Sequence, residues 1–128
     1  MAERTPAETV RVYLDEIYNK GRVELGPELL ADPTWRHQDG KLTQLSLAES
    51  MARLEANFKI WPTMRFDSAL TMVDGDKVAV AWNGHCTKPD GEVMHLYGIE
   101  IFRVAGGKIV EIWNSKEWPG LWQTSPLG

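Results

Sequence analysis

The chain has 128 residues, of which 25% are charged and 43% hydrophobic, and its formal net charge at pH 7 is −4. This length and composition are typical of one folded domain, spanning residues 1–128, that needs no metal or disulfide to stabilise its core. The negative charge and the scattered basic residues argue against nucleic acid as a partner.

Residues 1–9 carry charges where a secretory signal needs an apolar run, and about 18 consecutive apolar residues occur nowhere. We therefore expect a cytoplasmic protein with no membrane partner. Cys86 is the only cysteine and lacks the CxxC spacing of a zinc site, so we expect it to pack in the core. Six tryptophans in so short a chain suit a lined cavity or a subunit interface.

The N-terminal third predicts two helices and a strand. Residues 5–8, Thr-Pro-Ala-Glu, have the spacing of a capping box, and apolar residues then recur at helical intervals. The pattern predicts a helix over residues 6–20 that ends at Gly21. A brief second helix is expected over residues 27–31, and a short strand over residues 34–38.

A second capping box, Ser46-Leu47-Ala48-Glu49, predicts a third helix that ends near Trp61-Pro62. From there the pattern alternates as in strands, and glycine-containing turns separate the alternating segments. Helices followed by an antiparallel meander predict an α+β domain. The strands are expected over residues 63–73, 77–87, 92–105 and 108–116.

The turn between the second and third of these strands predicts which side chains share a face. Residues 88–91, Lys-Pro-Asp-Gly, suit a three-residue loop built on a type I turn. That register places Trp82 opposite Gly98 and Val80 opposite Glu100. Glu100 would then share a face with Trp82, and His85 would meet His95 on the other face.

Three segments, "YLDEIYNKG", "LADPTWRHQDG" and "GIEIFRVAGGKIVEIWN", occur in an order and spacing that resemble the SnoaL-like polyketide cyclases. That family lies within the nuclear-transport-factor-like superfamily, which includes ketosteroid isomerase. The resemblance implies a cone-shaped, curved antiparallel sheet that wraps three N-terminal helices. It also implies an apolar pocket, open at one end, for small hydrophobic ring compounds.

The resemblance assigns Glu100 to the position of the carboxylic acid in the oxyanion hole of ketosteroid isomerase. A carboxyl group among apolar side chains loses hydration, so its pKa rises toward the range useful for proton transfer. Glu100 is therefore one candidate catalytic residue. The alternative is that Glu100 faces solvent or pairs with Arg65 or Arg103.

His37 is the second catalytic candidate, because the resemblance aligns it with the general base of ketosteroid isomerase. It could instead bond the end of its strand, and Asp39 could take the same role if the strand were shifted. Asn114 stands where many SnoaL-like sequences carry a catalytic aspartate, and an amide cannot exchange protons. Asn114 could still bond a substrate carbonyl or hold the strand end.

The expected pocket is aromatic, which suits a flat ring ligand. Tyr13 or Tyr18 lies near the position of the isomerase's phenol donor, although packing in the core is the alternative for both. The substrate-binding candidates are Tyr13, Trp35, Phe58, Trp61, Trp82, Phe102, Ile112 and Asn114.

Alternation sends Ile99, Ile101 and Trp113 to the outer face of the sheet, where apolar residues need a cover. We therefore expect a homodimer formed through that face, with the tail "EWPGLW" nearby. His85 and His95 could hold a metal between them, but the pair has no third ligand, so we expect no metal site.

These observations predict cofactor-independent acid–base chemistry, namely cyclisation, isomerisation or dehydration, on a small hydrophobic carbonyl or polyketide-like compound. Glu100 and His37 would exchange the protons. The alternative is a small-molecule-binding protein that uses the same pocket without catalysis. Epoxide hydrolysis would need an Asp-Arg-Asp set in the cavity, and the sequence offers no convincing one.

Overall fold

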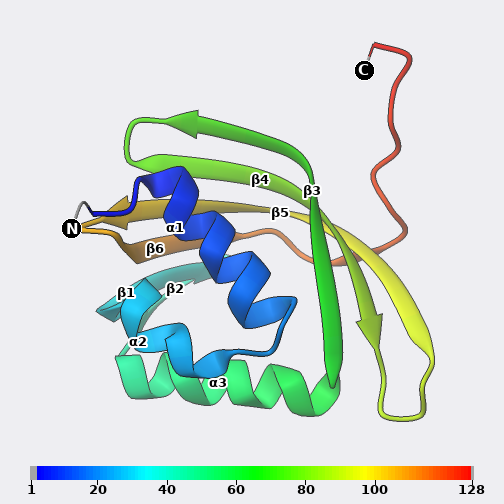
Figure 1. The fold of residues 1–128 in the computed structure, drawn as a ribbon, viewed down its shortest axis with the longest axis horizontal. Helices are drawn as coiled ribbons and strands as arrows, with labels where there is room; N and C mark the ends of the chain where they lie inside the picture. The colour runs from blue at the N-terminus through cyan, green and yellow to red at the C-terminus, as the bar shows by residue number, and fades with distance from the viewer. Residues whose placement is uncertain (1–2, 128) are drawn as a thin grey trace.

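The computed structural model describes residues 3–127, and its N-terminal part is helical (Figure 1). Helix α1 (Pro6–Val12) begins at Thr5, whose side chain accepts a hydrogen bond from the backbone N–H of Glu8. It continues without a break into a π-helical segment, η1 (Tyr13–Tyr18). A 3₁₀ turn, η2 (Val23–Leu25), and a short helix, α2 (Gly26–Leu29), follow.

From Leu30 to Leu127, the structure has one long helix and seven strands. Helix α3 (Leu47–Ile60) has the expected capping box between Ser46 and Glu49. The strands are β1 (Leu30–Gln38), β2 (Lys41–Leu45), β3 (Thr63–Asp74), β4 (Lys77–Thr87), β5 (Val93–Ala105), β6 (Lys108–Asn114) and β7 (Trp118–Pro119).

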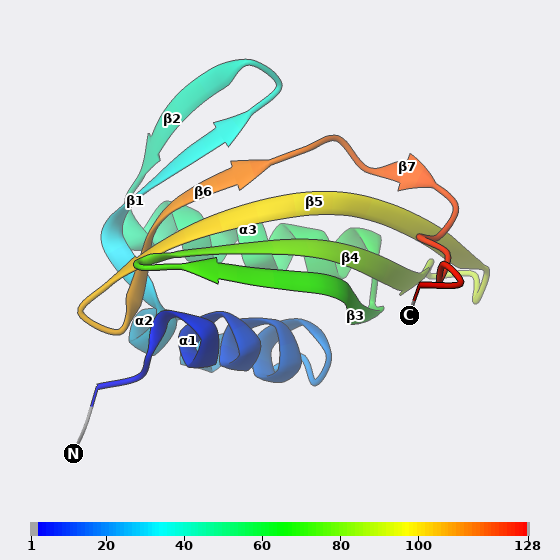
Figure 2. The same ribbon diagram turned by 90° about the horizontal axis from the view of Figure 1, so that it is seen from above.

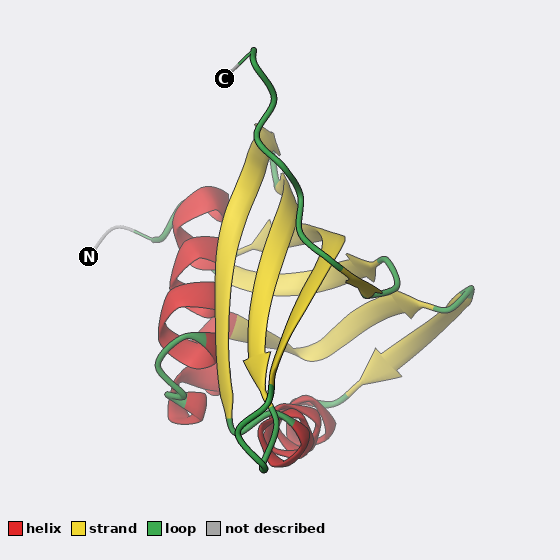
Figure 3. Ribbon diagram, turned by 90° about the vertical axis from the view of Figure 1, so that its right-hand side faces the viewer, coloured by secondary structure: helices red, strands yellow, loops and turns green. Residues whose placement is uncertain are grey.

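The strands form one open, curved sheet in the order β2-β1-β6-β5-β4-β3, and β7 pairs with β5 at one side. Neighbouring strands are antiparallel except β1 and β6, which run parallel, so the sheet is mixed. The helices lie on the inner side of the curve (Figures 2 and 3). This is the expected α+β architecture, with one parallel pair in addition.

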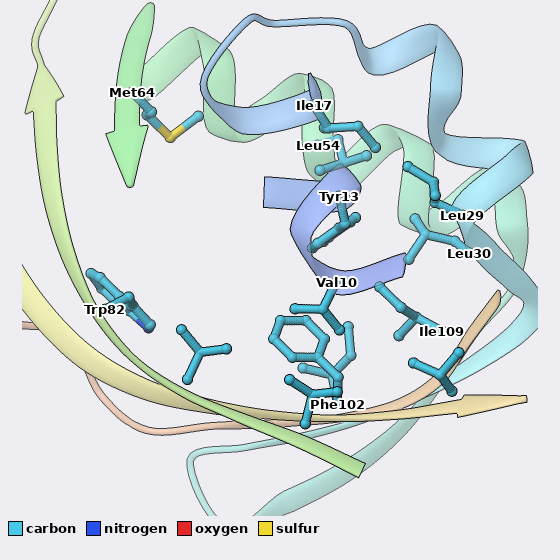
Figure 4. Packing of buried hydrophobic residues seen from close by; sticks show 14 of the residues in the cluster. Val10, Tyr13, Ile17, Leu29, Leu30, Leu54, Met64, Trp82, Phe102 and Ile109 are labelled. Atoms are coloured by element: carbon cyan, nitrogen blue, oxygen red, sulfur yellow. The ribbon is translucent and has the colours of Figure 1, made fainter. Parts of the chain in front are cut away.

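The core lies between the helices and the concave face of the sheet (Figure 4). The apolar residues of α1 and η1 recur on one side of the helix. They pack against every second residue of the strands, because these residues point to the concave face. Trp82 and Met64 lie apart from Leu29, Leu30 and Ile109 in this view. The fully buried apolar residues include Tyr13, Ile17, Leu29, Val78, Phe102, Ile109 and Ile112.

Two expectations for residues 27–45 need correction. The brief second helix ends at Leu29, and residues 30–31 already belong to β1, which is four residues longer at its start than expected. The hairpin partner β2 was not expected, because its five residues are mostly exposed and show no apolar alternation. The β4–β5 register agrees with the prediction, with Trp82 opposite Gly98 and Val80 opposite Glu100.

The C-terminal tail folds back over the outer face of the sheet (Figure 2). The backbone N–H of Gly120 donates to the His95 carbonyl, and the indole N–H of Trp122 donates to the Gly98 carbonyl. Trp118 and Trp122 both pack on the ring of Tyr97. The tail therefore covers part of β5, as expected for the segment "EWPGLW".

Within residues 3–127, no helix combines the length and apolar character that crossing a bilayer requires.

Candidate active site

Three neighbouring strands each contribute one polar side chain to the concave face of the sheet. Glu100 on β5 is paired in register with Asn114 on β6, and Arg36 on β1 is paired with Ile112, two residues before Asn114. Since side chains two residues apart point to the same face, Arg36, Asn114 and Glu100 lie in a row.

The carboxyl group of Glu100 lies on the concave side of the sheet and is largely shielded from bulk water. Its side chain is only 14% exposed. Burial raises the pKa of Glu100, while the Arg36 guanidinium and the hydrogen bond from Asn114 act in the opposite direction. Neither Arg65 nor Arg103 is its partner, because Arg65 lies near Asp67 and Arg103 lies near Asp76 and Glu111.

Arg36 is the positively charged side chain that lies beside Glu100. Its side chain is 9% exposed, and its Nη1 lies 3.9 Å from Oε2 of Glu100. Nη1 also donates a hydrogen bond to Oδ1 of Asn114. The Nε–H of Arg36 is buried and has no hydrogen-bond partner within residues 3–127.

Asn114 connects the two charged groups. Its Oδ1 accepts from Arg36, and its Nδ2 donates to Oε2 of Glu100 at 2.7 Å. The amide therefore satisfies a donor and an acceptor at once. Oε2 of Glu100 therefore receives this N–H, and Oε1 does not take part in the bond.

These groups line a cavity of about 190 Å³. The rest of the wall combines aromatic and aliphatic side chains with the polar residues Gln38, Arg53, Asn57, Ser115 and Glu117. Figure 4 shows Trp82 and Met64, two of the lining residues, at the end of the core away from Leu29 and Leu30. The apolar lining comprises Leu14, Tyr18, Trp61, Met64, Phe66, Trp82, Cys86 and Leu96.

The π-helical segment η1 positions Tyr18 in this wall. In this wider helix Tyr13 and Tyr18, five residues apart, come together, and their hydroxyl oxygens lie 3.3 Å apart. Burial raises the pKa of both phenols, so they remain protonated hydrogen-bond donors. Tyr13 is buried beneath the wall, against Phe102, whereas Tyr18 lines the cavity.

The indole of Trp82 needs the glycine that faces it across the β4–β5 pair. A Cβ at Gly98 would lie 2.5 Å from Cζ2 of Trp82, so the indole would have to shift to make room for it. The ring therefore lies over Gly98 and packs edge-to-face on Phe66, with the ring centroids 5.2 Å apart.

The expected ligand-binding residues separate into three groups. Trp61, Trp82 and Asn114 line the cavity together with Glu100. Phe58 lines a neighbouring surface hollow, and Tyr13, Phe102 and Ile112 lie within the core behind the wall. Trp35 is 41% exposed, because it alternates with the inward-facing Arg36 and so points out of the cone.

His37 does not share the cavity with Glu100. As the residue after Arg36, it points to the outer face, where its Nε2 lies 2.7 Å from Oε2 of Glu111. Its ring stacks on Trp113 at an interplanar angle of 6°. Asp39 lies in the β1–β2 turn with a positive φ of 54° and is likewise outside the cavity lining.

Arg36 is the charged partner of Glu100 that sequence reasoning missed, and Arg53, Asn57 and Glu117 are further cavity residues that it did not name. Both faces of the segment "TWRHQDG" carry polar residues, so alternation alone could not show which face turns inward. The available signal was Glu100 itself, because a buried carboxylate requires a cation nearby.

His85 and His95 meet on the outer face as expected, with their Nδ1 atoms 2.9 Å apart. His85 also lies 3.4 Å from Asp67 through its Nε2. Across the described part of the chain, no three His, Cys, Asp or Glu side chains are grouped to hold a metal ion.

Comparison with known proteins agrees with this architecture. Solved structures with the same fold include a candidate polyketide cyclase from Acidithiobacillus ferrooxidans, with TM-score 0.77, 20% identity and 90% of each chain covered. Wild-type IdmH from Streptomyces antibioticus has TM-score 0.73 and 22% identity, with 88% of this chain and 91% of IdmH covered.

A cystatin-fold protein from Novosphingobium aromaticivorans has TM-score 0.74 and 15% identity, with 88% of this chain and 99% of that chain covered. Among curated proteins, none matches the sequence. The family model for the SnoaL-like polyketide cyclases matches residues 8–118. This match spans most of the 128 residues, so the chain belongs to the SnoaL-like polyketide cyclase family.

Proposed function

We propose that this protein catalyses cofactor-independent proton transfer on a small hydrophobic carbonyl compound, with Glu100 as the group that takes and returns the proton. The family membership supports a cyclase-type role. The observation that carries the proposal is the buried Glu100 carboxyl, hydrogen-bonded by Asn114, in a cavity that has aromatic and aliphatic side chains in its wall. A carboxyl group whose pKa is raised by burial is a stronger base when ionised than a solvated one.

The proposed step begins with a ligand whose acidic C–H bond, next to a carbonyl, lies against Oε1 of Glu100. The carboxylate takes the hydrogen as a proton, and the electron pair of the C–H bond moves onto the carbonyl oxygen to form an enolate. Return of the proton to another carbon gives isomerisation. Attack of the enolate on a second carbonyl of the same molecule gives ring closure, and Glu100 then protonates the new alkoxide.

Because Arg36 lies beside Glu100, this step adds no charge to the buried site. Before the transfer the cavity holds the Arg36 cation and the Glu100 anion, 3.9 Å apart. Afterwards Glu100 is neutral and the enolate is the anion, so the number of buried charges is unchanged. Creating an extra unpaired charge in such a site would oppose the reaction strongly.

The test is hydrogen–deuterium exchange at carbons next to a carbonyl, followed by NMR in D₂O with a panel of one-, two- and three-ring ketones. The wild-type protein should accelerate exchange for at least one ketone. Glu100→Gln should lower that rate by about a hundredfold or more, because an amide cannot exchange the proton. Glu111→Gln is the matched control, since Glu111 lies on the outer face beside His37.

The rival function is ligand binding without turnover, and Asn114 favours it, because no proton can be exchanged at that position. Quenching of tryptophan fluorescence reports binding separately, since Trp61 and Trp82 line the cavity. Ketones that quench the fluorescence but exchange no faster than in buffer would support the rival. Equal exchange rates for wild type and Glu100→Gln would remove Glu100 from the mechanism.

A further inference from the structure

Two exposed side chains mark the mouth of the cavity. Most of the residues that line the cavity are buried or half-buried, whereas Gln38 and Glu117 are exposed. Gln38 is the last residue of β1, and Glu117 lies three residues after the end of β6. The cavity therefore opens to solvent beside the ends of these two neighbouring strands.

Helix α3 borders the same mouth. Arg53, Asn57 and Trp61 line the cavity, and their spacing of four residues places them on one face of the helix. Gln38 lies two residues after the inward-facing Arg36, so its side chain points to the same concave side of the sheet. Arg53 and Gln38 thus approach each other across the mouth from a helix and a strand.

A hydrogen bond joins these two side chains. Nη2 of Arg53 donates to Oε1 of Gln38 at 3.0 Å. Gln38 is exposed and Arg53 is half-buried, so rotation about side-chain torsions can break the bond without moving the backbone. The backbone of Gln38 is held in place, because it pairs with Lys41 across the tight turn of Asp39 and Gly40, whose φ angles are 54° and 74°.

We propose that the hydrogen bond between Arg53 and Gln38 is a latch that controls how fast a ligand enters and leaves the cavity. The latch narrows the mouth when the bond is formed and widens it when the bond breaks. It lies at the rim and re-forms once the ligand is inside, so it stabilises the empty and the occupied protein alike. A latch of this kind changes the rates of binding and leaves the affinity unchanged.

The latch rests on the proposed function only in taking this cavity as the ligand site, which the non-catalytic alternative shares. The experiment follows the binding of prodan, a neutral, fluorescent two-ring ketone, to the full-length protein by stopped-flow fluorescence. Substitutions are made at Gln38, because the charge of Arg53 also acts on Glu100. Gln38→Met removes the acceptor at a similar side-chain length, and Gln38→Glu replaces it with a charged acceptor.

The matched controls are Gln44→Met and Gln44→Glu. Gln44 is an exposed residue of β2 that pairs with the outward-facing Trp35, so it lies on the other face of the sheet. Both controls should bind prodan with the rate constants of the wild type.

Gln38→Met should raise the association and dissociation rate constants of prodan by the same factor, about two- to tenfold, which is the range that loss of one side-chain hydrogen bond allows. The dissociation constant should therefore stay unchanged. Gln38→Glu should lower both rate constants by about twofold or more, because an ion pair with Arg53 keeps the mouth closed for longer. Salt at about 1 M should relieve this slowing, since it screens exposed charges.

The proposal is overturned if the two Gln38 variants leave the rate constants unchanged, shift them in the same direction, or change the dissociation constant alone. Absence of prodan binding in every protein, the wild type included, would also count against it. Should Gln38→Met fail to fold, Gln38→Ala removes the same acceptor. These measurements need no turnover, so a latch that behaves as expected in a protein without ketone exchange would sink the proposed function alone.

Discussion

The buried Glu100 carboxyl makes the stability of the fold depend on pH. Burial raises the pKa of its carboxyl, so the folded protein holds this proton more tightly than the unfolded chain does. Below the ordinary pKa of a glutamate, about 4.3, the carboxyl is neutral in both states. As the pH rises above that value the unfolded chain ionises first, and the folded state loses stability relative to it.

Glu100→Gln should therefore be more stable than the wild type at neutral pH, because glutamine resembles the protonated acid and never ionises. The gain should shrink toward zero as the pH falls below about 4. Urea unfolding at a series of pH values measures it, with Glu55→Gln on the exposed side of α3 as the control, expected to match the wild type. A glutamine variant less stable than the wild type at neutral pH would contradict this account.

At the scale of elements, the side chain of Asn19 links η1 to β3 through two hydrogen bonds. Asn19, just after η1, accepts a 2.6 Å hydrogen bond from the backbone N–H of Phe66 and donates a 3.1 Å hydrogen bond to its carbonyl. Strand β3 lies at the edge of the sheet, so Asn19 takes the place of a missing neighbouring strand. Phe66 lines the cavity and packs on Trp82, so this link also supports the site.

Asn19→Ala should lower the free energy of unfolding by about 1–3 kcal/mol, because two backbone groups lose their partner. Urea unfolding checks the value. The adjacent Lys20→Ala removes only an exposed ion pair with Glu16 and should change stability by less than about 1 kcal/mol. If the two alanine variants were equally stable, the hydrogen bonds of Asn19 would not contribute to the free energy of unfolding.

The sequence predicted those elements whose signals are local. The capping boxes located α1 and α3, and the turn at residues 88–91 fixed the register that brings Glu100 to the face of Trp82. The parallel pairing of β1 with β6 joins residues more than 70 positions apart. No local pattern encodes that pairing.

The missed pairing explains the main error at the site. Without β6 as a reference, nothing in β1 showed that Arg36 turns inward and His37 outward. The resemblance to the general base of a related enzyme favours the outer residue, His37. The inner residue, Arg36, is the one that contacts Asn114 and lies near Glu100.

At the scale of the whole molecule, the outer face of the sheet remains apolar beyond the area covered by the tail. Leu70, Met72 and Ile99 are 58%, 62% and 42% exposed. Apolar side chains gathered on one face mark a surface that another molecule covers. We propose that a second copy of this chain covers it, which gives a homodimer.

Sedimentation at micromolar concentration should then show a dimer, and Ile99→Glu should shift it toward the monomer, because a charge would be buried at the interface. Ile60→Glu is the control, since Ile60 is 58% exposed at the end of α3, away from the sheet face, and should leave the dimer intact. A wild-type monomer under these conditions would end the dimer proposal.

The C-terminal tail would couple this association to ligand binding. Ser115 and Glu117 form part of the cavity wall, and a few residues later Trp118 and Trp122 lie on Tyr97 at the outer face. One short segment thus borders both the ligand and the surface where the second copy would sit. Whatever immobilises the segment from one side reduces the entropy loss left for the other, so ligand affinity should increase with protein concentration, and a bound ligand should tighten self-association by the same factor.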